Sequence, residues 1–261
     1  PRLYAAEDEL VIRDELTVSR EQAIEGAVLG AKRTVEEIIA LAGVIKDLPE
    51  NTPTLALMDG SLIMLGLLGY GNRGFVLREL IDEGFVKALE TIRQMAESRP
   101  LAVASYISLP RSNEVINGTR LQLCPYEVAS CDRYCGNLKA GQRPCDVGAY
   151  GLTDRDVFSE ILGPGERSTV FTSSSPLVEK HYRGHEVQFF YVRVGEEIGR
   201  IEVPSWVAED ETLLGLVHSL VVDQCRRGPG YPTVLMEAHE QAVITGANRG
   251  DFARLLENAL Y

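Results

Sequence analysis

Positive charge and long apolar runs are both scarce in this sequence. Its 261 residues contain 26 lysine and arginine residues against 38 aspartate and glutamate residues, so the formal net charge is −12 at pH 7. This balance argues against a protein that coats nucleic acid or an anionic membrane through bulk positive charge, although it leaves room for a local basic track. No apolar run reaches the roughly 18 residues that span a bilayer, so no membrane partner is expected.

Other absences narrow the class of protein further. No basic and apolar signal region precedes Pro1, and five cysteines, an odd number, do not suggest a secreted disulfide scaffold. We therefore expect a cytoplasmic protein. There is no Walker A motif, so any movement driven by ATP must come from a partner. The 45% apolar and 25% charged residues are typical of a globular protein.

The spacing of apolar residues predicts an α/β fold, with a mixed sheet flanked by helices, a long N-terminal helix and a C-terminal helical region. Residues 1–50 are expected to be a charged arm and an amphipathic helix, which opens at the capping-box pair Ser19 and Gln22. Residues 51–261 are expected to form the main domain. Strands are predicted at 54–58 and 62–68 as one hairpin, at 101–109, and at 187–194 and 198–203 as a second hairpin. Helices are predicted at 77–95, 113–123, 156–162, 210–226, 233–245 and 251–260.

The sharpest chemical feature is Asp59, which ends an apolar strand and is followed by Gly60 and Ser61. This pattern places a carboxylate at the rim of a sheet, where nearby oxygens can complete the shell of a hard cation. The structural alternative is an aspartate that caps a turn before the next strand.

Two further acids follow separate predicted elements. Asp154 precedes an apolar-periodic segment and is either a second metal ligand or a first-turn acid of a helix capped by Thr153. Glu114 follows the strand at 101–109 and is either a third ligand or another first-turn acid. Jointly, three such carboxylates suit magnesium or manganese, and two ions of this kind can flank a phosphodiester.

A C-terminal pair also stands out. His239 shares a predicted helix face with Leu235 and Ala242, and is either a hydrogen-bonded histidine at the edge of the core or a ligand or proton donor. Tyr231 precedes Pro232, which suits the first turn of that helix. Its hydroxyl is either structural or in contact with a phosphate.

In this order, the Asp59-Gly60-Ser61 element, the segment from Thr153 to Ser168 and the Tyr231-Pro232…Ala238-His239 helix resemble the NurA family of DNA nucleases. The resemblance implies an RNase H-like sheet and hydrolysis of DNA that depends on manganese or magnesium. It also implies 5′-to-3′ exonuclease and single-strand endonuclease activity in DNA end resection, and a homodimer that docks on a hexameric HerA translocase. By this resemblance Asp59 and Asp154 would bind metal, and Tyr231 and His239 would be the C-terminal active-site pair. Glu114 is the least direct match.

Four cysteines depart from the short family pattern. Cys124, Cys131, Cys135 and Cys145 lie in a predicted insertion at about 124–147, with gaps of six, three and nine residues between them. Four thiolates in such a loop can hold structural zinc or an iron–sulfur cluster, and the alternative is a loop of reduced thiols or local disulfides. Cys225 lies on a predicted helix and is expected to be buried.

Two other function classes stay open. The segment from Gly69 to Gly74 matches G-x-G-x-x-G, as in an NAD(P)-dependent oxidoreductase, but the strand at 101–109 ends without an acid for a ribose. A non-catalytic scaffold for a DNA translocase is the other alternative. Three arginines, Arg111, Arg155 and Arg167, are candidate phosphate contacts or ordinary surface ion-pair partners.

Overall fold

The computed structural model describes residues 26–70, 74–243, 250 and 254–255. The expected arm at 1–18, the Ser19 cap and most of the expected helix at 251–260 lie outside the described residues. Part of the Gly69–Gly74 segment lies outside them as well.

A five-stranded mixed sheet forms the centre of the molecule, in the order β1-β2-β5-β4-β3. Strand β1 (Thr54–Asp59) runs parallel to β2 (Leu101–Ile107), and every other neighbouring pair is antiparallel. Strands β4 (Val187–Val194) and β5 (Glu197–Pro204) form the predicted second hairpin, and β3 (Phe171–Thr172) is a two-residue edge. The predicted mixed sheet with flanking helices is confirmed.

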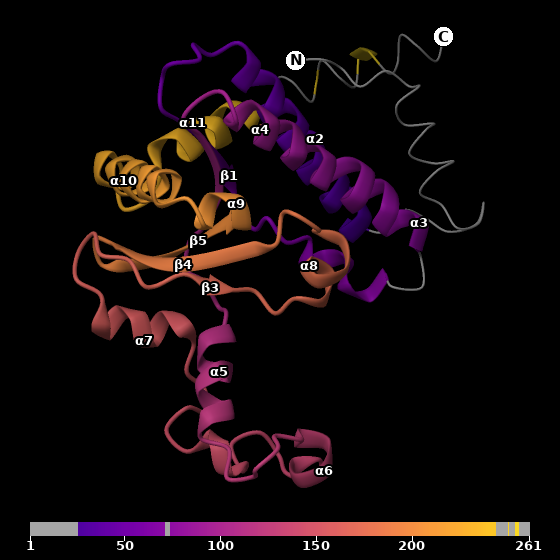
Figure 1. Cartoon of the computed structure of the whole chain (residues 1–261), viewed down its shortest axis with the longest axis vertical. Coiled ribbons are helices and arrows are strands. Elements are labelled where there is room, and N and C mark those ends of the chain that lie inside the picture. The colour runs from indigo at the N-terminus through magenta and orange to yellow at the C-terminus, as the bar shows by residue number, and fades with distance from the viewer. Residues whose placement is uncertain (1–25, 71–73, 244–249, 251–253, 256–261) are drawn as a thin grey trace.

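Helices cover the sheet on both sides (Figure 1). On one side of β4 and β5 lie α9 (Ser205–Ala208) and α10 (Glu211–Arg227), and on the other lies α7 (Asp154–Ile161). The long helices α2 (Gly26–Lys46) and α4 (Lys87–Ala96) contact each other and cover β1 and β2. The remaining helices are α3 (Gly74–Leu77), α5 (Glu114–Gln122), α6 (Cys131–Cys135), α8 (Pro176–His181) and α11 (Thr233–Ala242), with a π-helical segment at Arg78–Val86 and 3₁₀ segments at Leu65–Tyr70 and Pro144–Asp146. None of the helices described is both long and apolar enough to cross a membrane.

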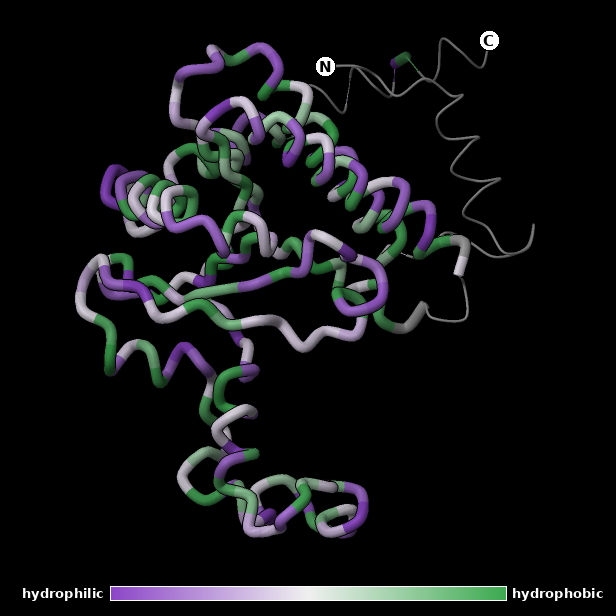
Figure 2. Tube along the Cα trace, viewed as in Figure 1, coloured by the Kyte–Doolittle hydropathy of each residue, from purple (hydrophilic) through white to green (hydrophobic). Residues whose placement is uncertain are grey.

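The apolar core follows the amphipathic pattern of the helices. Along α2, hydrophobic residues alternate with hydrophilic ones (Figure 2), and the buried ones recur at helical spacing from Val28 to Ile45. They pack in one continuous core with the sheet, α4 and α10. A smaller cluster lies under α7, where the Phe158 ring stacks on Tyr191 with 4.6 Å between ring centroids.

The first predicted hairpin is wrong. Strand β1 pairs with β2, and the run after Asp59 turns into the 3₁₀ segment at Leu65–Tyr70. The backbone of Leu62 bonds to side chains instead of to a neighbouring strand. Its amide donates to the Glu202 carboxylate (2.9 Å), and its carbonyl accepts from the Tyr182 hydroxyl (2.9 Å). The Gly69–Gly74 segment therefore does not follow a strand, as a dinucleotide-binding turn requires.

The sheet contains a glycine at which a side chain would not fit. A Cβ on Gly199 of β5 would lie 2.8 Å from the ring of Tyr106. We expect Gly199→Ala to lower the free energy of unfolding by about 1–3 kcal/mol, because the ring is buried and has little room to move.

The matched control is Gly215→Ala on an exposed turn of α10, where a Cβ meets no atom within 4 Å. This change should raise the free energy of unfolding by roughly 0.5–1 kcal/mol, since alanine favours a helix over glycine. Urea denaturation of both variants measures the difference, and equal effects in the two would contradict the packing of Tyr106 against Gly199.

Candidate functional site

The candidate site begins at Asp59, the last residue of β1, whose side chain is exposed. Gly60 follows with a φ of +92°, and its amide donates to the Tyr106 carbonyl at 3.0 Å, which turns the chain away from the sheet. The Tyr231 hydroxyl lies near the Asp59 carboxylate. Burial raises the pKa of Tyr231, and Asp59 raises it further, so Tyr231 stays a protonated donor at neutral pH.

Packing fixes this tyrosine in place. The rings of Tyr106 and Tyr231 meet edge to face, with centroids 5.5 Å apart, and Tyr106 lies beside Asp59 in the register of β1 and β2. Two residues that are 172 positions apart, Asp59 and Tyr231, are thereby brought together.

A third side chain near this pair was missed by the sequence analysis. Glu37 on α2 is exposed and pairs with Arg33 at 3.5 Å. Partial burial raises its pKa, Arg33 lowers it, and the charge of Asp59 raises it again. Glu37 thus stands near enough to Asp59 for the two carboxylates to repel each other. In the sequence Glu37 is one of many acids on the polar side of a helix, and no signal separates it from the rest.

Asp154 is in a different environment from Asp59. It is fully buried, and its two oxygens accept hydrogen bonds from the amides of Val115 and Ile116 (3.2 and 2.9 Å) and from the Tyr191 hydroxyl (2.7 Å). The Ser112 hydroxyl donates to the same carboxylate at 3.2 Å. Asp154 therefore satisfies the first amides of α5, although it lies at the start of α7.

The predicted cap of α7 is present. Thr153 is the N-cap of α7, and it forms a capping box with Asp156, whose carboxylate accepts from the Thr153 amide at 2.7 Å.

Glu114 faces a buried arginine. Its carboxylate lies 3.6 Å from the Arg200 guanidinium, and the Ser173 hydroxyl lies 3.5 Å away. Burial raises the pKa of Glu114, and the attraction of Arg200 offsets this only in part. Arg200 also donates to Ser112 (3.0 Å) and lies 3.7 Å over the Phe189 ring.

The partner of Arg200 within β5 is Glu202, which the sequence analysis also missed. Arg200 Nε donates to Glu202 at 2.9 Å, and both side chains are buried. The other oxygen of Glu202 accepts from the Ser61 hydroxyl (2.7 Å) and the Leu62 amide (2.9 Å). Two opposite charges in an otherwise apolar strand are a signal that could have identified this pair.

The expected three-acid centre is not assembled in this structure. Across the described ranges, no three or more His, Cys, Asp or Glu side chains are arranged to hold a metal ion. The physical reason is that Glu114 faces Arg200 and Asp154 caps α5, so Asp59 does not share a ligand group with either. Their metal-binding role stays a prediction.

The remaining predicted contacts lie at the surface. His239 is exposed on α11 rather than at the edge of the core, and Arg111 is exposed as well. Arg155 and Arg167 are half-buried, and the Arg167 guanidinium lies 5.6 Å from the centroid of Phe190. The geometry brings none of these four to the Asp59–Tyr231 pair through a contact among the described residues.

The cysteine segment stands apart from the sheet. Residues 123–150, which we name the knob, follow α5 and carry α6 away from the body of the molecule (Figure 1). All five cysteines of the chain are free thiols, and Cys225 is buried on α10 as expected. The four knob cysteines line one cavity of about 10 Å³. Burial raises the pKa of Cys135, and the neighbouring thiols raise it further.

Elemental analysis tests the predicted metal role of the knob. If the four thiols bind zinc or an iron–sulfur cluster, protein purified without chelator should contain about one zinc or a matching amount of iron per chain. Cys135→Ser should remove this metal, whereas Cys225→Ser should retain it. Metal-free protein in both cases would leave a loop of reduced thiols.

The capping contacts of Asp154 predict a stability effect. Asp154→Asn should lower the free energy of unfolding by about 1–3 kcal/mol, because an amide group would present hydrogens to buried donors. Asp132→Asn, an exposed substitution in α6, should change it by less than about 0.5 kcal/mol. Urea unfolding measures both, and an Asp154→Asn protein as stable as the wild type would contradict the capping role.

Comparisons with known proteins give a family for this chain. A search of curated proteins finds no match. The crystal structure of the NurA nuclease from Sulfolobus solfataricus is similar, with 15% sequence identity and a TM-score of 0.42, over 87% of this chain and 66% of that one. The chain thus spans just under two thirds of that protein's length. The family model of the NurA domain matches residues 3–244, and the chain therefore belongs to the NurA domain family.

Proposed function

We propose that this protein is a DNA nuclease whose chemistry takes place at the Asp59 end of β1. Membership of the NurA domain family supports a nuclease. The observation that carries the proposal is the pair of Asp59 and Tyr231, in which an exposed carboxylate at a strand end lies near a protonated phenol. Exposure matters, because a carboxylate that contacts a cation or a phosphodiester must be reachable from solvent.

The residues around Asp59 can supply one or two carboxylates to a divalent cation. Magnesium keeps several waters and is commonly held by one or two carboxylates together with substrate phosphates. Asp59 and, beside it, Glu37 supply such carboxylates, whereas Glu114 and Asp154 have their oxygens turned to Arg200 and α5. Manganese or magnesium bound there would supply a Lewis acid for phosphodiester hydrolysis.

Other residues of the chain would orient this carboxylate. Tyr231 lies near Asp59 and is proposed to donate to it, which would fix the direction of its free oxygen lone pairs. Glu202 binds Ser61 and Leu62 and so fixes the turn that follows Asp59. His239 lies exposed on α11, the helix that begins two residues after Tyr231, and is proposed to position the substrate or to transfer a proton.

The finer assignment rests on the resemblance of the sequence motifs to the family. We propose 5′-to-3′ exonuclease and single-strand endonuclease activity in DNA end resection. A homodimer acting with a hexameric HerA translocase is proposed as the assembly. Such enclosure suits a chain of net charge −12, because the charge disfavours binding of free DNA without cations or a partner.

The proposed function predicts loss of cleavage on removal of one charge. Asp59→Asn should reduce hydrolysis of labelled single- and double-stranded DNA by at least about 100-fold, as when a group that stabilises the transition state is removed. Tyr231→Phe should reduce it by about 10- to 100-fold, since only the orienting contact is lost. EDTA should abolish cleavage, and manganese or magnesium should restore it.

Asp47→Asn is the matched control, because Asp47 is an exposed aspartate that follows the end of α2. It should leave cleavage unchanged. Hydrolysis that persists in EDTA and in Asp59→Asn would overturn the proposal. Binding of a translocase without any hydrolysis would favour the non-catalytic scaffold instead.

A further inference from the structure

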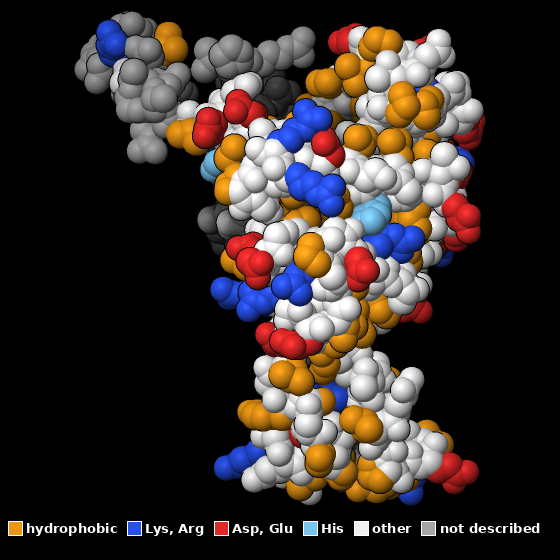
Figure 3. All heavy atoms as spheres, turned by 90° about the vertical axis from the view of Figure 1, so that its left-hand side faces the viewer, with side chains coloured by type: hydrophobic (Ala, Val, Ile, Leu, Met, Phe, Trp, Pro, Cys, Tyr) orange, Lys and Arg blue, Asp and Glu red, His pale blue; other side chains and the backbone are white. Residues whose placement is uncertain are grey.

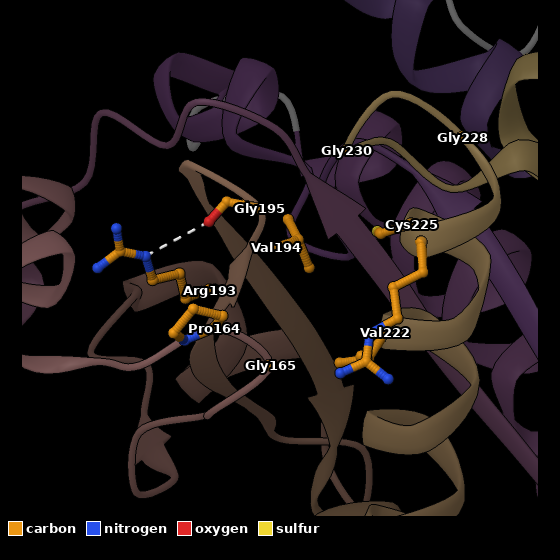
Figure 4. A pocket seen from close by; sticks show the side chains of 10 residues that line it. Pro164, Gly165, Arg193, Val194, Gly195, Val222, Cys225, Gly228 and Gly230 are labelled. Carbon is orange, nitrogen blue, oxygen red and sulfur yellow. Dashed lines mark hydrogen bonds between the residues drawn. The ribbon is translucent and has the colours of Figure 1, made fainter.

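A cavity of about 320 Å³ lies between α10 and the ends of β4 and β5 (Figure 4). Its volume is at the lower end of the range for sites that bind small ligands. One wall is formed by Val194 and Gly195 of the β4–β5 turn together with Gly165, and the opposite wall by Val222 and Cys225 of α10 (Figure 4). Figure 3 shows the left-hand side of Figure 1, with several lysine and arginine side chains across its middle, interspersed with acidic ones.

The lining of this cavity exposes much backbone and contains no acidic residue. Four of its ten residues are glycines, at positions 165, 195, 228 and 230, and its two charged residues are Arg193 and Arg226. Gly165 has a φ of +81°, and a Cβ there would lie 3.0 Å from Arg226 Nη2. Glycine at this position therefore leaves room for the guanidinium beside the loop.

The two arginines differ in their hydrogen-bond partners. Arg193 donates to the carbonyls of Ser159 (2.9 Å) and Leu162 (3.0 Å), and in Figure 4 its guanidinium points away from the α10 wall. Arg226 makes no hydrogen bond or ion pair with any residue that the structure describes. It is thus the cation of this cavity that is available to a ligand.

Two carbonyls at the end of α10 have hydrogen-bond partners other than Arg226. Basic side chains often stabilise the last turn of a helix, where carbonyls lack partners. Here the Gln224 carbonyl accepts from the Thr233 hydroxyl at 3.2 Å, and the Cys225 carbonyl accepts from the Gly230 amide at 3.3 Å. These carbonyls are satisfied without the arginine.

The cavity is connected to the candidate site through one short segment. Gly228 and Gly230 line it, and the next residue, Tyr231, lies near Asp59. The Tyr106 hydroxyl lies 3.4 Å from the Gly230 carbonyl, and Tyr106 neighbours Asp59 in the sheet. One wall of the cavity is therefore continuous with the protein segment beside Asp59.

We propose that this cavity binds a backbone phosphate of the DNA strand, with Arg226 as its cation, and so positions the strand at Asp59. The inference rests on the proposed nuclease function. Arginine binds phosphate through paired N–H donors, and a glycine-lined wall lets a bulky phosphodiester approach the backbone closely.

Binding of DNA without cleavage tests this assignment. The full chain carrying Asp59→Asn is titrated with a fluorescein-labelled single-stranded oligonucleotide, and fluorescence anisotropy is followed at several salt concentrations. Adding Arg226→Ala should raise the Kd about five- to tenfold and lower the salt slope by about 0.7, as for one lost contact to a single-strand phosphate. Arg226→Lys should retain part of the affinity.

Arg227→Ala is the matched control. Arg227 is exposed on the same last turn of α10, but it pairs with Asp223 at 2.8 Å and does not line the cavity. Its removal should change the Kd less than twofold. Equal losses in the Arg226 and Arg227 variants, or none in Arg226→Ala, would overturn the inference, and urea unfolding checks that each variant is folded.

The outcomes separate this inference from the proposed function. Cleavage that needs Asp59, together with normal DNA binding by Arg226→Ala, would refute the cavity and leave the nuclease. Selective loss of binding in Arg226→Ala, together with cleavage unaffected by Asp59→Asn, would refute the Asp59 chemistry and leave the cavity. Adding a deoxynucleoside monophosphate as a competitor tests whether the cavity is instead a site for free product. Displacement of the oligonucleotide at low micromolar concentrations of the monophosphate would overturn the assignment to DNA.

Discussion

The buried carboxylate of Glu202 connects the turn after Asp59 to the centre of the sheet. One of its oxygens binds Ser61 and Leu62, immediately after the strand that ends in Asp59, and the other binds Arg200. Arg200 in turn reaches Glu114 and Ser112, beside the start of α5. A buried charge is costly unless it is paired and hydrogen-bonded, so this arrangement tolerates little displacement of any member. The position of the turn after Asp59 depends on it.

The same network explains why the three predicted carboxylates have different roles. Arg200 and the amides of α5 attract Glu114 and Asp154 into the interior, where both act on neighbouring protein groups. Asp59 is not a member of this network, and its side chain stays exposed. Carboxylates of the same chemistry therefore have different roles: the buried ones support the fold, and the exposed one contacts solvent.

Local patterns in the sequence predicted most elements, because helical and alternating spacing of apolar residues is a local property. The pairing of strands is not local. The run from Leu62 to Leu68 has the composition of a strand, and only the distant partners Glu202 and Tyr182 explain why it forms none. Glu37 and Arg226 were missed for the same reason, since their surroundings come from other elements. Asp59 and Tyr231 were found because each stands at the end of an apolar pattern.

The position of Asp154 has a mechanical consequence. Its carboxylate joins the first turn of α5 to Tyr191 in β4, and Tyr191 is stacked on Phe158 of α7. The knob at the far end of α5 (Figure 1) is thus connected to the body of the molecule through a buried acceptor that bonds Tyr191, a member of the smaller apolar cluster. A displacement of the knob would therefore strain hydrogen bonds that reach β4, and β4 is the strand whose end forms one wall of the Arg226 cavity.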